Sequence, residues 1–196
     1  MIIHDISRDT LTTPVYDGDP LTKVDEIRRI ENGDNYNLSA VHMSVHSGTH
    51  IDAPLHFCED GKPVNEIRLN TFMGKCTVIT VEGILTGEDM DRLLPYCKRR
   101  ILFHGEGKTF LSASAARVIA ESQVVLVGTD ADSIAPDFEE EISHRILCDA
   151  GVVILENLDL SDISDGEYEI CAFPIKLGGL EAAPCRAILL EQERGI

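Results

Sequence analysis

The sequence predicts an α/β domain in which a mixed β-sheet is flanked by helices. Short apolar segments typical of strands recur along the chain, and segments with helix-capping residues lie between them. Some strand segments alternate apolar and polar residues and others are wholly apolar, a combination typical of sheets with one or both faces covered. With 196 residues, 43% of them hydrophobic, the chain is long enough for one domain spanning residues 1–196.

The first part of the chain contains short predicted strands separated by turns. Ile2–Ile6 favours a strand, and the turn-forming residues Tyr16-Asp17-Gly18-Asp19-Pro20 favour a loop. Asn32-Gly33-Asp34 separates two extended stretches, and the second, Leu38–His46, has its more apolar side chains at odd positions. We therefore expect the even positions, including His46, to point away from the densest packing.

The rest of the chain alternates predicted strands and helices. Thr86–Leu94 is expected to form a helix capped by Thr86, and Ser112–Ser122 a second helix. A third helix over Asp137–Ala150 has glutamates near its positive end and Gly151 after its last residue. The strands predicted in this part are 76–81, 100–103, 124–127, 152–156, 170–175 and 186–192.

Charge and composition exclude several classes of partner. The 34 acidic and 17 basic residues give a net charge of -17, which repels nucleic-acid backbones and anionic lipids. No apolar run approaches the roughly 20 residues of a membrane span, and the opening MIIHDISRDTL has neither the basic start nor the apolar core of a secretory signal. We expect a cytoplasmic protein that binds a small molecule.

The six cysteines include no CxxC pair, so we expect reduced and mostly buried thiols. Cys58 differs from the others because it directly follows His56 and Phe57. Whether it contributes to a pocket stays open, since use as a nucleophile requires a lowered pKa.

A cluster of histidines indicates a metal site. His46, His50, Asp52 and His56 lie at even positions, so an extended backbone would place all four side chains on one face. In a straight strand, however, His46 and His50 would stand roughly 13 Å apart, too far to share an ion bound at about 2 Å. The chain must bend between them, and Gly48 can bend without steric penalty. The alternative is a set of unrelated surface histidines around an ordinary turn.

The remaining histidines are His4, His42, His104 and His144. The first three are single imidazoles in predicted strands, and we expect structural or solvent-facing roles for them. From His144 the helix would run roughly 9 Å to Gly151, and the following strand would return roughly 13 Å to Glu156. The two side chains could therefore meet, although spacing alone favours an exposed helix residue and a salt-bridged strand end.

The segment HSGTHIDAPLHF, residues 46–57, resembles the HxGTHxDxPxHF signature of the metal-dependent cyclase family, which includes bacterial kynurenine formamidases. The similarity extends over most of the chain. It includes Asp5-Ile6-Ser7, Tyr16-Asp17-Gly18-Asp19-Pro20, Gly128-Thr129-Asp130, the His144–Glu156 unit, Phe173-Pro174 and Arg186-Ala187-Ile188-Leu189.

The resemblance implies a swivelling β/β/α fold, with a mixed sheet or barrel flanked by helices, and a homodimer or homotetramer. It also implies a ligand set in which His46, His50 and Asp52 hold one metal ion. Asp52, His144 and Glu156 would hold a second ion or complete a single site. The expected cofactor is Zn²⁺, as one or two ions, with Mn²⁺ as the other possibility.

The resemblance implies hydrolysis of an amide-type bond by water that the metal activates, with His56 as the catalytic acid and base. The best candidate reaction converts N-formylkynurenine to kynurenine and formate in tryptophan catabolism. Tyr16 and Phe57 are expected to contact the substrate, and Thr49 or a loop amide to steady the oxyanion. Formamidases of the family often carry Trp-Pro-Gly-Asp where this chain has Tyr16-Asp17-Gly18-Asp19.

Two alternatives stay open. The chain could hydrolyse another amide, a cyclic amide of the isatin type or a lactone. It could also be a metal-containing binding protein without turnover, although structural zinc sites favour cysteine and closed tetrahedra. The number of ions and the oligomeric state also stay open.

Overall fold

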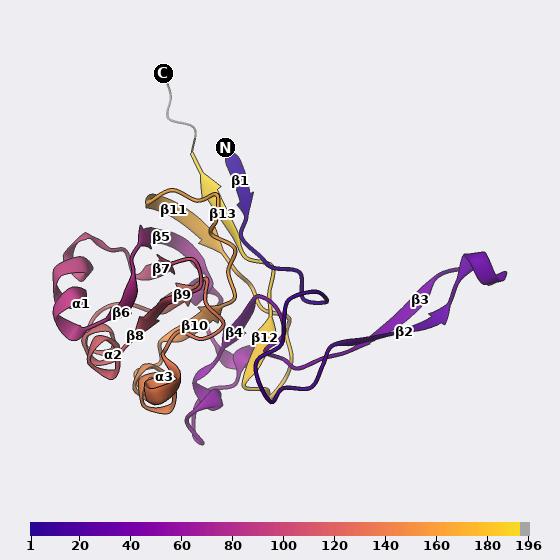
Figure 1. The fold of residues 1–196 in the computed structure, drawn as a ribbon, viewed down its shortest axis with the longest axis horizontal. Coiled ribbons are helices and arrows are strands. Elements are labelled where there is room, and N and C mark those ends of the chain that lie inside the picture. Colours follow the sequence, from indigo (N-terminus) through magenta and orange to yellow (C-terminus); the bar gives the residue numbers. More distant parts are fainter. Residues whose placement is uncertain (193–196) are drawn as a thin grey trace.

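A curled nine-stranded sheet forms the body of the protein in the computed structural model, which describes residues 1–192 (Figure 1). The order of its strands across the sheet is β1-β13-β11-β5-β7-β9-β10-β4-β12. These strands are β1 Ile2–Asp5, β4 His50–Asp52, β5 Met73–Thr80, β7 Arg100–His104, β9 Leu126–Thr129, β10 Val153–Glu156, β11 Gly166–Cys171, β12 Ala182–Pro184 and β13 Ile188–Glu191.

The centre of the sheet is parallel and both flanks are antiparallel. Strands β5, β7, β9 and β10 pair in parallel. Strand β11 joins β5 antiparallel on one side, and β4 joins β10 antiparallel on the other. The predicted α/β fold with a mixed sheet is therefore confirmed.

The helices cover one face of the sheet. They are α1 Gly87–Leu93, α2 Ala113–Ala120 and α3 Glu140–Asp149. One apolar core, which includes Phe103, Val127 and Ile119, lies between these helices and the sheet. A second core on the opposite face includes Ile51 and Leu189, from strands near opposite ends of the sheet. The sheet curls around this second core as a half-barrel.

All three predicted helices form, and α1 has the predicted cap. Helix α2 ends two residues before Ser122, and α3 begins at Glu140 because Asp137–Glu139 forms a 3-10 turn. Thr86 is the N-cap of α1 and forms a capping box with Asp89. Ser112 caps α2, and its hydroxyl accepts a hydrogen bond from the amide of Ala115. Gly151 follows α3 with a φ of +73°, a conformation that favours glycine.

Several strand boundaries differ from the prediction. The strand expected at 124–127 is β9, Leu126–Thr129, and the strand expected at 170–175 is β11, Gly166–Cys171. Pro174 follows β11 and has no amide proton to donate to a ladder. Three short strands were not predicted, because three residues carry too little periodicity to recognise. They are β6 Gly83–Leu85, β8 Thr109–Leu111 and β12 Ala182–Pro184.

Single-turn 3-10 helices connect several of these elements. They are η1 Ile30–Asn32, η2 Pro54–His56, η3 Val64–Glu66, η4 Leu69–Thr71, η5 Leu94–Tyr96 and η6 Asp137–Glu139. No helix within residues 1–192 has the length and apolar character needed to cross a bilayer.

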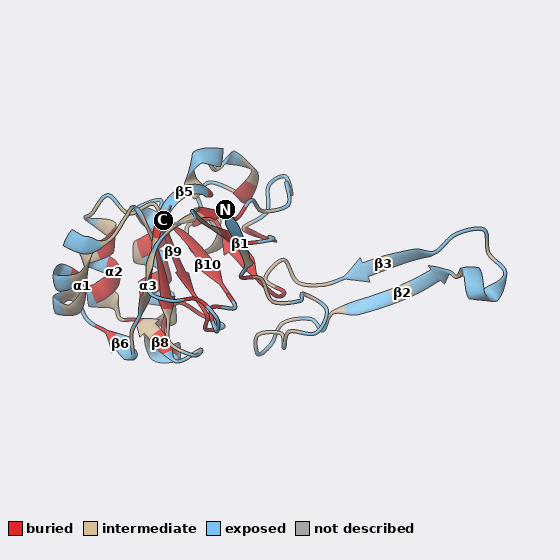
Figure 2. Cartoon of the chain, turned by 90° about the horizontal axis from the view of Figure 1, so that it is seen from above, coloured by how far each residue is buried: buried red, intermediate tan, exposed pale blue. Residues whose placement is uncertain are grey.

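A two-stranded arm projects from the body, as Figure 1 and Figure 2 show. It consists of β2, Lys23–Arg28, and β3, Leu38–His42, with η1 at its tip. The predicted strand Leu38–His46 thus ends four residues early. The expectation that its odd positions are the buried ones is wrong, because Val41 is 47% exposed and both faces of the arm are open.

The cysteines within residues 1–192 form no disulfide. Cys76 and Cys148 are buried and the other four are half-buried, so the expectation of mostly buried thiols is wrong for those four.

Candidate metal centre

The first candidate ligands come from a turn and the strand that follows it. His46 lies in a turn, and His50 and Asp52 lie on one face of β4. Between them Gly48 has a φ of +65°, and a Cβ at this position would lie 2.7 Å from the Cα of Thr10. The chain therefore bends at Gly48, as the sequence predicts, and only glycine fits there.

The next candidate ligand comes from the neighbouring strand. In the antiparallel pair of β4 and β10, Glu156 lies directly opposite His50. As a result, Oε2 of Glu156 lies 3.4 Å from Nε2 of His50. Helix α3 then brings Nε2 of His144 to 3.3 Å from Oε1 of Glu156. Both His144 and Glu156 are buried, so they are not the exposed pair that spacing alone favoured.

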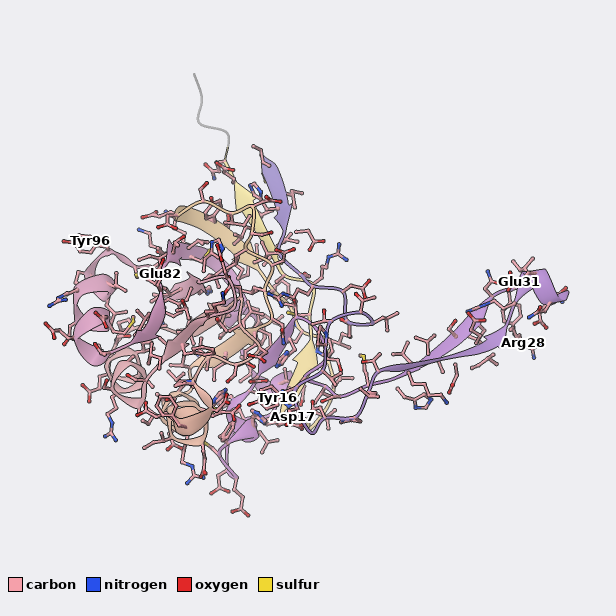
Figure 3. The ribbon with its side chains drawn as sticks, in the orientation of Figure 1. Tyr16, Asp17, Arg28, Glu31, Glu82 and Tyr96 are labelled. Atoms are coloured by element: carbon pink, nitrogen blue, oxygen red, sulfur yellow. The ribbon has the colours of Figure 1, made fainter. Side chains whose placement is uncertain are left out.

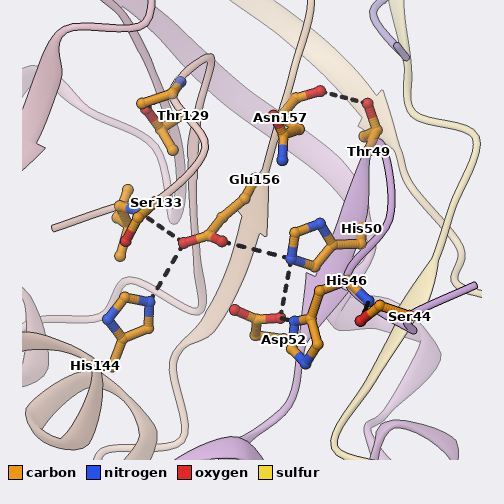
Figure 4. A network of polar contacts seen from close by, with 12 residues as sticks. Ser44, His46, Thr49, His50, Asp52, Thr129, Ser133, His144, Glu156 and Asn157 are labelled. Carbon is orange, nitrogen blue, oxygen red and sulfur yellow. Dashed lines mark hydrogen bonds and ion pairs between the residues drawn. The ribbon is translucent and has the colours of Figure 1, made fainter. Parts of the chain in front are cut away.

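Five side chains meet in two groups that share one carboxylate (Figure 4). In each group the possible ligand atoms lie within 4.8 Å of one another. Oδ1 of Asp52 lies 3.0 Å from Nδ1 of His46 and 3.3 Å from Nε2 of His50. The two groups are His46, His50 and Asp52, and Asp52, His144 and Glu156.

The donor set fits a divalent cation. Nε2 of His50 and Oδ1 of Asp52 are buried without a hydrogen-bond partner, and leaving such atoms unpaired is costly. The opposite ring nitrogens are already engaged, since Nδ1 of His50 lies 2.9 Å from the carbonyl of Gly48 and Nδ1 of His144 lies 2.8 Å from that of Glu140. Both rings therefore direct Nε2 inward, as metal-binding histidines do.

Burial and charge act in opposite directions on these groups. Burial alone would lower the pKa of His50, but Asp52 and Glu156 hold it well above its ordinary value. Burial likewise would lower the pKa of His144, but Glu156 raises it to about 9. The pKa of Asp52, which burial alone would raise, is held well below its ordinary value by His50 and His46. Without a cation, protons on the imidazoles balance the buried carboxylates.

A cavity of about 250 Å³ opens onto the ligands. Half-buried His56 lines it, with its ring centroid 4.4 Å from that of His46. Burial, together with the positive charges of His46 and His144, lowers the pKa of His56. His56 is therefore neutral at pH 7 and can accept a proton.

Two of the three residues expected to bind substrate line this cavity. Tyr16 comes from the N-terminal loop (Figure 3), and Phe57 stacks on His144 with ring centroids 4.7 Å apart. Thr49 does not line it. Its hydroxyl donates to the carbonyl of Asn157 at 2.5 Å and accepts from the amide of Arg8 at 2.8 Å. Because side chains alternate along the extended chain, Thr49 points away from the side occupied by His50.

The cavity also contains residues that the sequence reasoning missed. They are Asp19, Asp132, Glu140 and Asn157. Glu140 lies four residues before His144 on α3 and so shares its helix face, a spacing that could have identified it. Asn157 has a φ of +56°, which its sequence neighbours do not predict. The amide of Ile134 also went unrecognised, and it donates to Oε1 of Glu156 at 2.7 Å.

The three other histidines lie away from this cavity. His4 pairs with Glu191 at 2.9 Å, His42 with Asp25 at 3.1 Å and His104 with Asp130 at 3.7 Å. Cys58 is also absent from the cavity lining. Burial and the neighbouring Asp149 raise the pKa of the Cys58 thiol to about 11, the opposite of what a nucleophile requires.

Comparisons with known proteins show which family the chain resembles. The Cyclase family model, described as "Putative cyclase", matches residues 2–136. The chain is similar to a kynurenine formamidase of Erythrobacter litoralis, with 35% identity over 91% of this chain and 88% of the relative.

Two solved structures share the fold. One is a potential metal-dependent hydrolase with cyclase activity, with 32% identity, a TM-score of 0.79 and 98% of both chains covered. The other is isatin hydrolase A from Labrenzia aggregata, with a TM-score of 0.82 over 97% of this chain and 94% of that one. At 19% identity the second likeness concerns the fold alone.

The raised pKa values of His50 and His144 predict that metal uptake depends on pH. Both imidazoles are protonated at neutral pH in the metal-free protein, and each must lose a proton to offer Nε2 to a cation. The apparent Zn²⁺ affinity should therefore rise with pH up to about pH 9, the pKa of His144, with at least one proton released per ion. Calorimetric titration in buffers of different ionisation enthalpy measures this release, and uptake without proton release would contradict the assignment.

Proposed function

Because the chain belongs to the cyclase family, we propose that it is a metal-dependent hydrolase that cleaves the acyl–nitrogen bond of an aryl formamide. The proposed reaction converts N-formylkynurenine to kynurenine and formate. One observation carries this proposal. Two candidate ligand groups that share Asp52, buried except for half-buried His46, face a cavity that also contains a neutral imidazole and two aromatic side chains.

His46, His50, Asp52, His144 and Glu156 would hold one or two divalent ions. Imidazole and carboxylate ligands suit Zn²⁺ and also Mn²⁺. When bound, such an ion activates water for attack and polarises the acyl oxygen. Further hydrogen bonds hold three of these side chains, His50, His144 and Glu156, in place. The amide of Ile134, for example, donates to Glu156.

His56 moves the proton in this proposal. Its lowered pKa leaves a ring nitrogen free to accept a proton from the attacking water. The same nitrogen then delivers that proton to the departing arylamine. His56 contacts His46, Phe57 and His144 through its ring, so its position is fixed by packing.

Tyr16 and Phe57 provide aromatic walls for an aryl ring. Phe57 is held by its stacking on His144, which places the aryl site next to the ligands. Thr49 takes no part in binding here. We assign it a positioning role, because its hydroxyl ties the ligand loop to the backbone of Asn157.

Replacement of His56 should separate metal binding from turnover. We predict that His56→Ala keeps its metal content while its kcat falls by about 10²- to 10⁴-fold, because only the proton carrier is lost. His50→Ala, in contrast, should lose bound metal. Elemental analysis and a spectrophotometric formamidase assay on both variants test this, and loss of metal from His56→Ala would show that His56 is a ligand.

A substrate screen tests the proposed reaction against its rivals. The metal-loaded protein should hydrolyse N-formylkynurenine and formanilides faster than isatin or simple lactones. If the loaded protein turned over none of these compounds, a binding protein would become the better account. An open cavity beside His56 favours the enzyme, since structural metal sites are closed.

We further propose that the protein is a homo-oligomer joined through the arm, and that it works in the reducing cytoplasm. Six unpaired cysteines support the location. The arm supports the oligomer, because an isolated two-stranded ribbon is only marginally stable in water. Val24 and Val41 lie opposite each other on it, 42% and 47% exposed, without covering from the described chain.

Light scattering after size-exclusion chromatography should therefore give a dimer or larger mass for the natural chain. Val41→Asp should lower that mass, because the charge would be buried in the contact. Leu69→Asp is the control, because it makes the same kind of change at an exposed apolar position outside the arm. It should leave the mass unchanged. A monomeric natural chain would contradict the proposal.

A further inference from the structure

The mouth of the cavity is acidic. Asp19, Asp132 and Glu140 line it and come from three different segments: the N-terminal loop, the loop after β9, and the first residue of α3. No lysine or arginine is among the residues that line the cavity. The basic residues that line the cavity are four histidines at its inner end. Three of them, His46, His50 and His144, are candidate metal ligands, and the fourth, His56, is the proposed proton carrier.

No basic side chain in the described part of the chain neutralises these three carboxylates. Among residues 1–192, none of them forms an ion pair with a lysine or arginine. The hydroxyl of Ser133 lies 3.4 Å from Oε1 of Glu140. Burial and a hydrogen bond to Glu140 raise the pKa of the Tyr16 phenol, with further contributions from Asp137 and Asp132. The phenol thus lies close to these carboxylates.

The cavity therefore has two regions with different charge balance. At the inner end, His50 and His144 compensate Asp52 and Glu156. Nε2 of His50 is buried, has no hydrogen-bond partner, and lies 3.3 Å from Asp52 and 3.4 Å from Glu156. At the mouth, the negative charges have no such partner. A ligand that extends from the inner end to the mouth therefore meets uncompensated negative charge with its distal group.

We propose that the preferred substrate carries a protonated amino group at the end distant from the scissile bond, and that Asp19, Asp132 and Glu140 bind this ammonium group. The inference rests on the proposed function and identifies its substrate class as ammonium-bearing aryl formamides. Anionic substrates are disfavoured, because a carboxylate at the mouth would face like charges without a basic partner.

N-formylkynurenine carries both an ammonium and a carboxylate on its side chain. Only the ammonium has partners in this cavity, so the carboxylate must turn toward solvent. The decarboxylated compound, which keeps the ammonium alone, should consequently be an equal or better substrate. This ordering distinguishes charge recognition at the mouth from simple recognition of the aryl formamide.

Four compounds with one ortho-formamidophenyl ketone core provide the test. Their side chains carry an ammonium, an ammonium with a carboxylate, no charge, and a carboxylate alone. We expect kcat/KM of the Zn²⁺-loaded enzyme to fall in that order, with the ammonium compound ahead of the carboxylate compound by about 10- to 100-fold. Added salt should narrow the difference, because the mouth is open to solvent.

Substitutions locate the recognition. Asp132→Asn and Glu140→Gln should each reduce the ratio of kcat/KM between the ammonium and carboxylate compounds by several-fold, mainly through KM. Asp17→Asn is the matched control, because it removes the same charge from an exposed residue of the Tyr16 loop that does not line the cavity. Its ratio should stay at the natural value. A natural enzyme that favours the carboxylate compound, or is indifferent to charge, would overturn the proposal.

A second test requires no turnover. Calorimetry measures how tightly the Zn²⁺-loaded protein binds the four deformylated amines. If the charge order appears in binding while no formamide is hydrolysed, the proposed function fails and the recognition of ammonium stands. If formamides are hydrolysed and neither binding nor kcat/KM follows charge, the proposed function stands and this inference fails.

Discussion

The pairing of β4 with β10 is the constraint on which the site depends. The antiparallel register places Glu156 opposite His50, and the alternation of β4 places Asp52 on the same side as His50. The backbone pairing thus fixes the positions from which two carboxylates and an imidazole extend into the site. Helix α3 then contributes His144 from the layer that covers the sheet. A shift of this register by one residue would turn His50 and Asp52 to the opposite face.

This arrangement buries several ionisable side chains away from solvent. Buried carboxylates are tolerated only with partners, and here the partners are imidazoles whose other nitrogens are fixed by the carbonyls of Gly48 and Glu140. Nε2 of His50 and Oδ1 of Asp52 form no hydrogen bond, although they lie at ion-pair distance, 3.3 Å apart. The same contacts that fix the candidate ligands bring two carboxylates and three imidazoles together, a donor set that suits a divalent cation. In the proposed mechanism His56 stays outside this set and carries the proton.

Much of this centre follows from sequence, because its geometry is local. The even spacing of His46, His50 and Asp52 and the need for a bend at Gly48 are properties of an extended chain with alternating side chains. His144 can approach Glu156 because the chain reverses direction at Gly151, so that β10 returns alongside the part of α3 that carries His144. Spacing could only permit that contact, however, and the family resemblance was needed to favour it.

What the sequence did not predict depends on contacts between distant segments. The arm shows ordinary strand alternation, so nothing in Leu38–His46 indicated that both of its faces would be open. Nothing in the sequence indicates that the hydroxyl of Thr49 forms hydrogen bonds with the backbone of Arg8 and Asn157, which lie far away along the chain. X-ray diffraction at the zinc absorption edge, from crystals of the active Zn²⁺-loaded protein, tests the centre most directly. The account predicts anomalous density within about 2.3 Å of Nε2 of His50 and an oxygen of Asp52. Ordered zinc bound only elsewhere would contradict it.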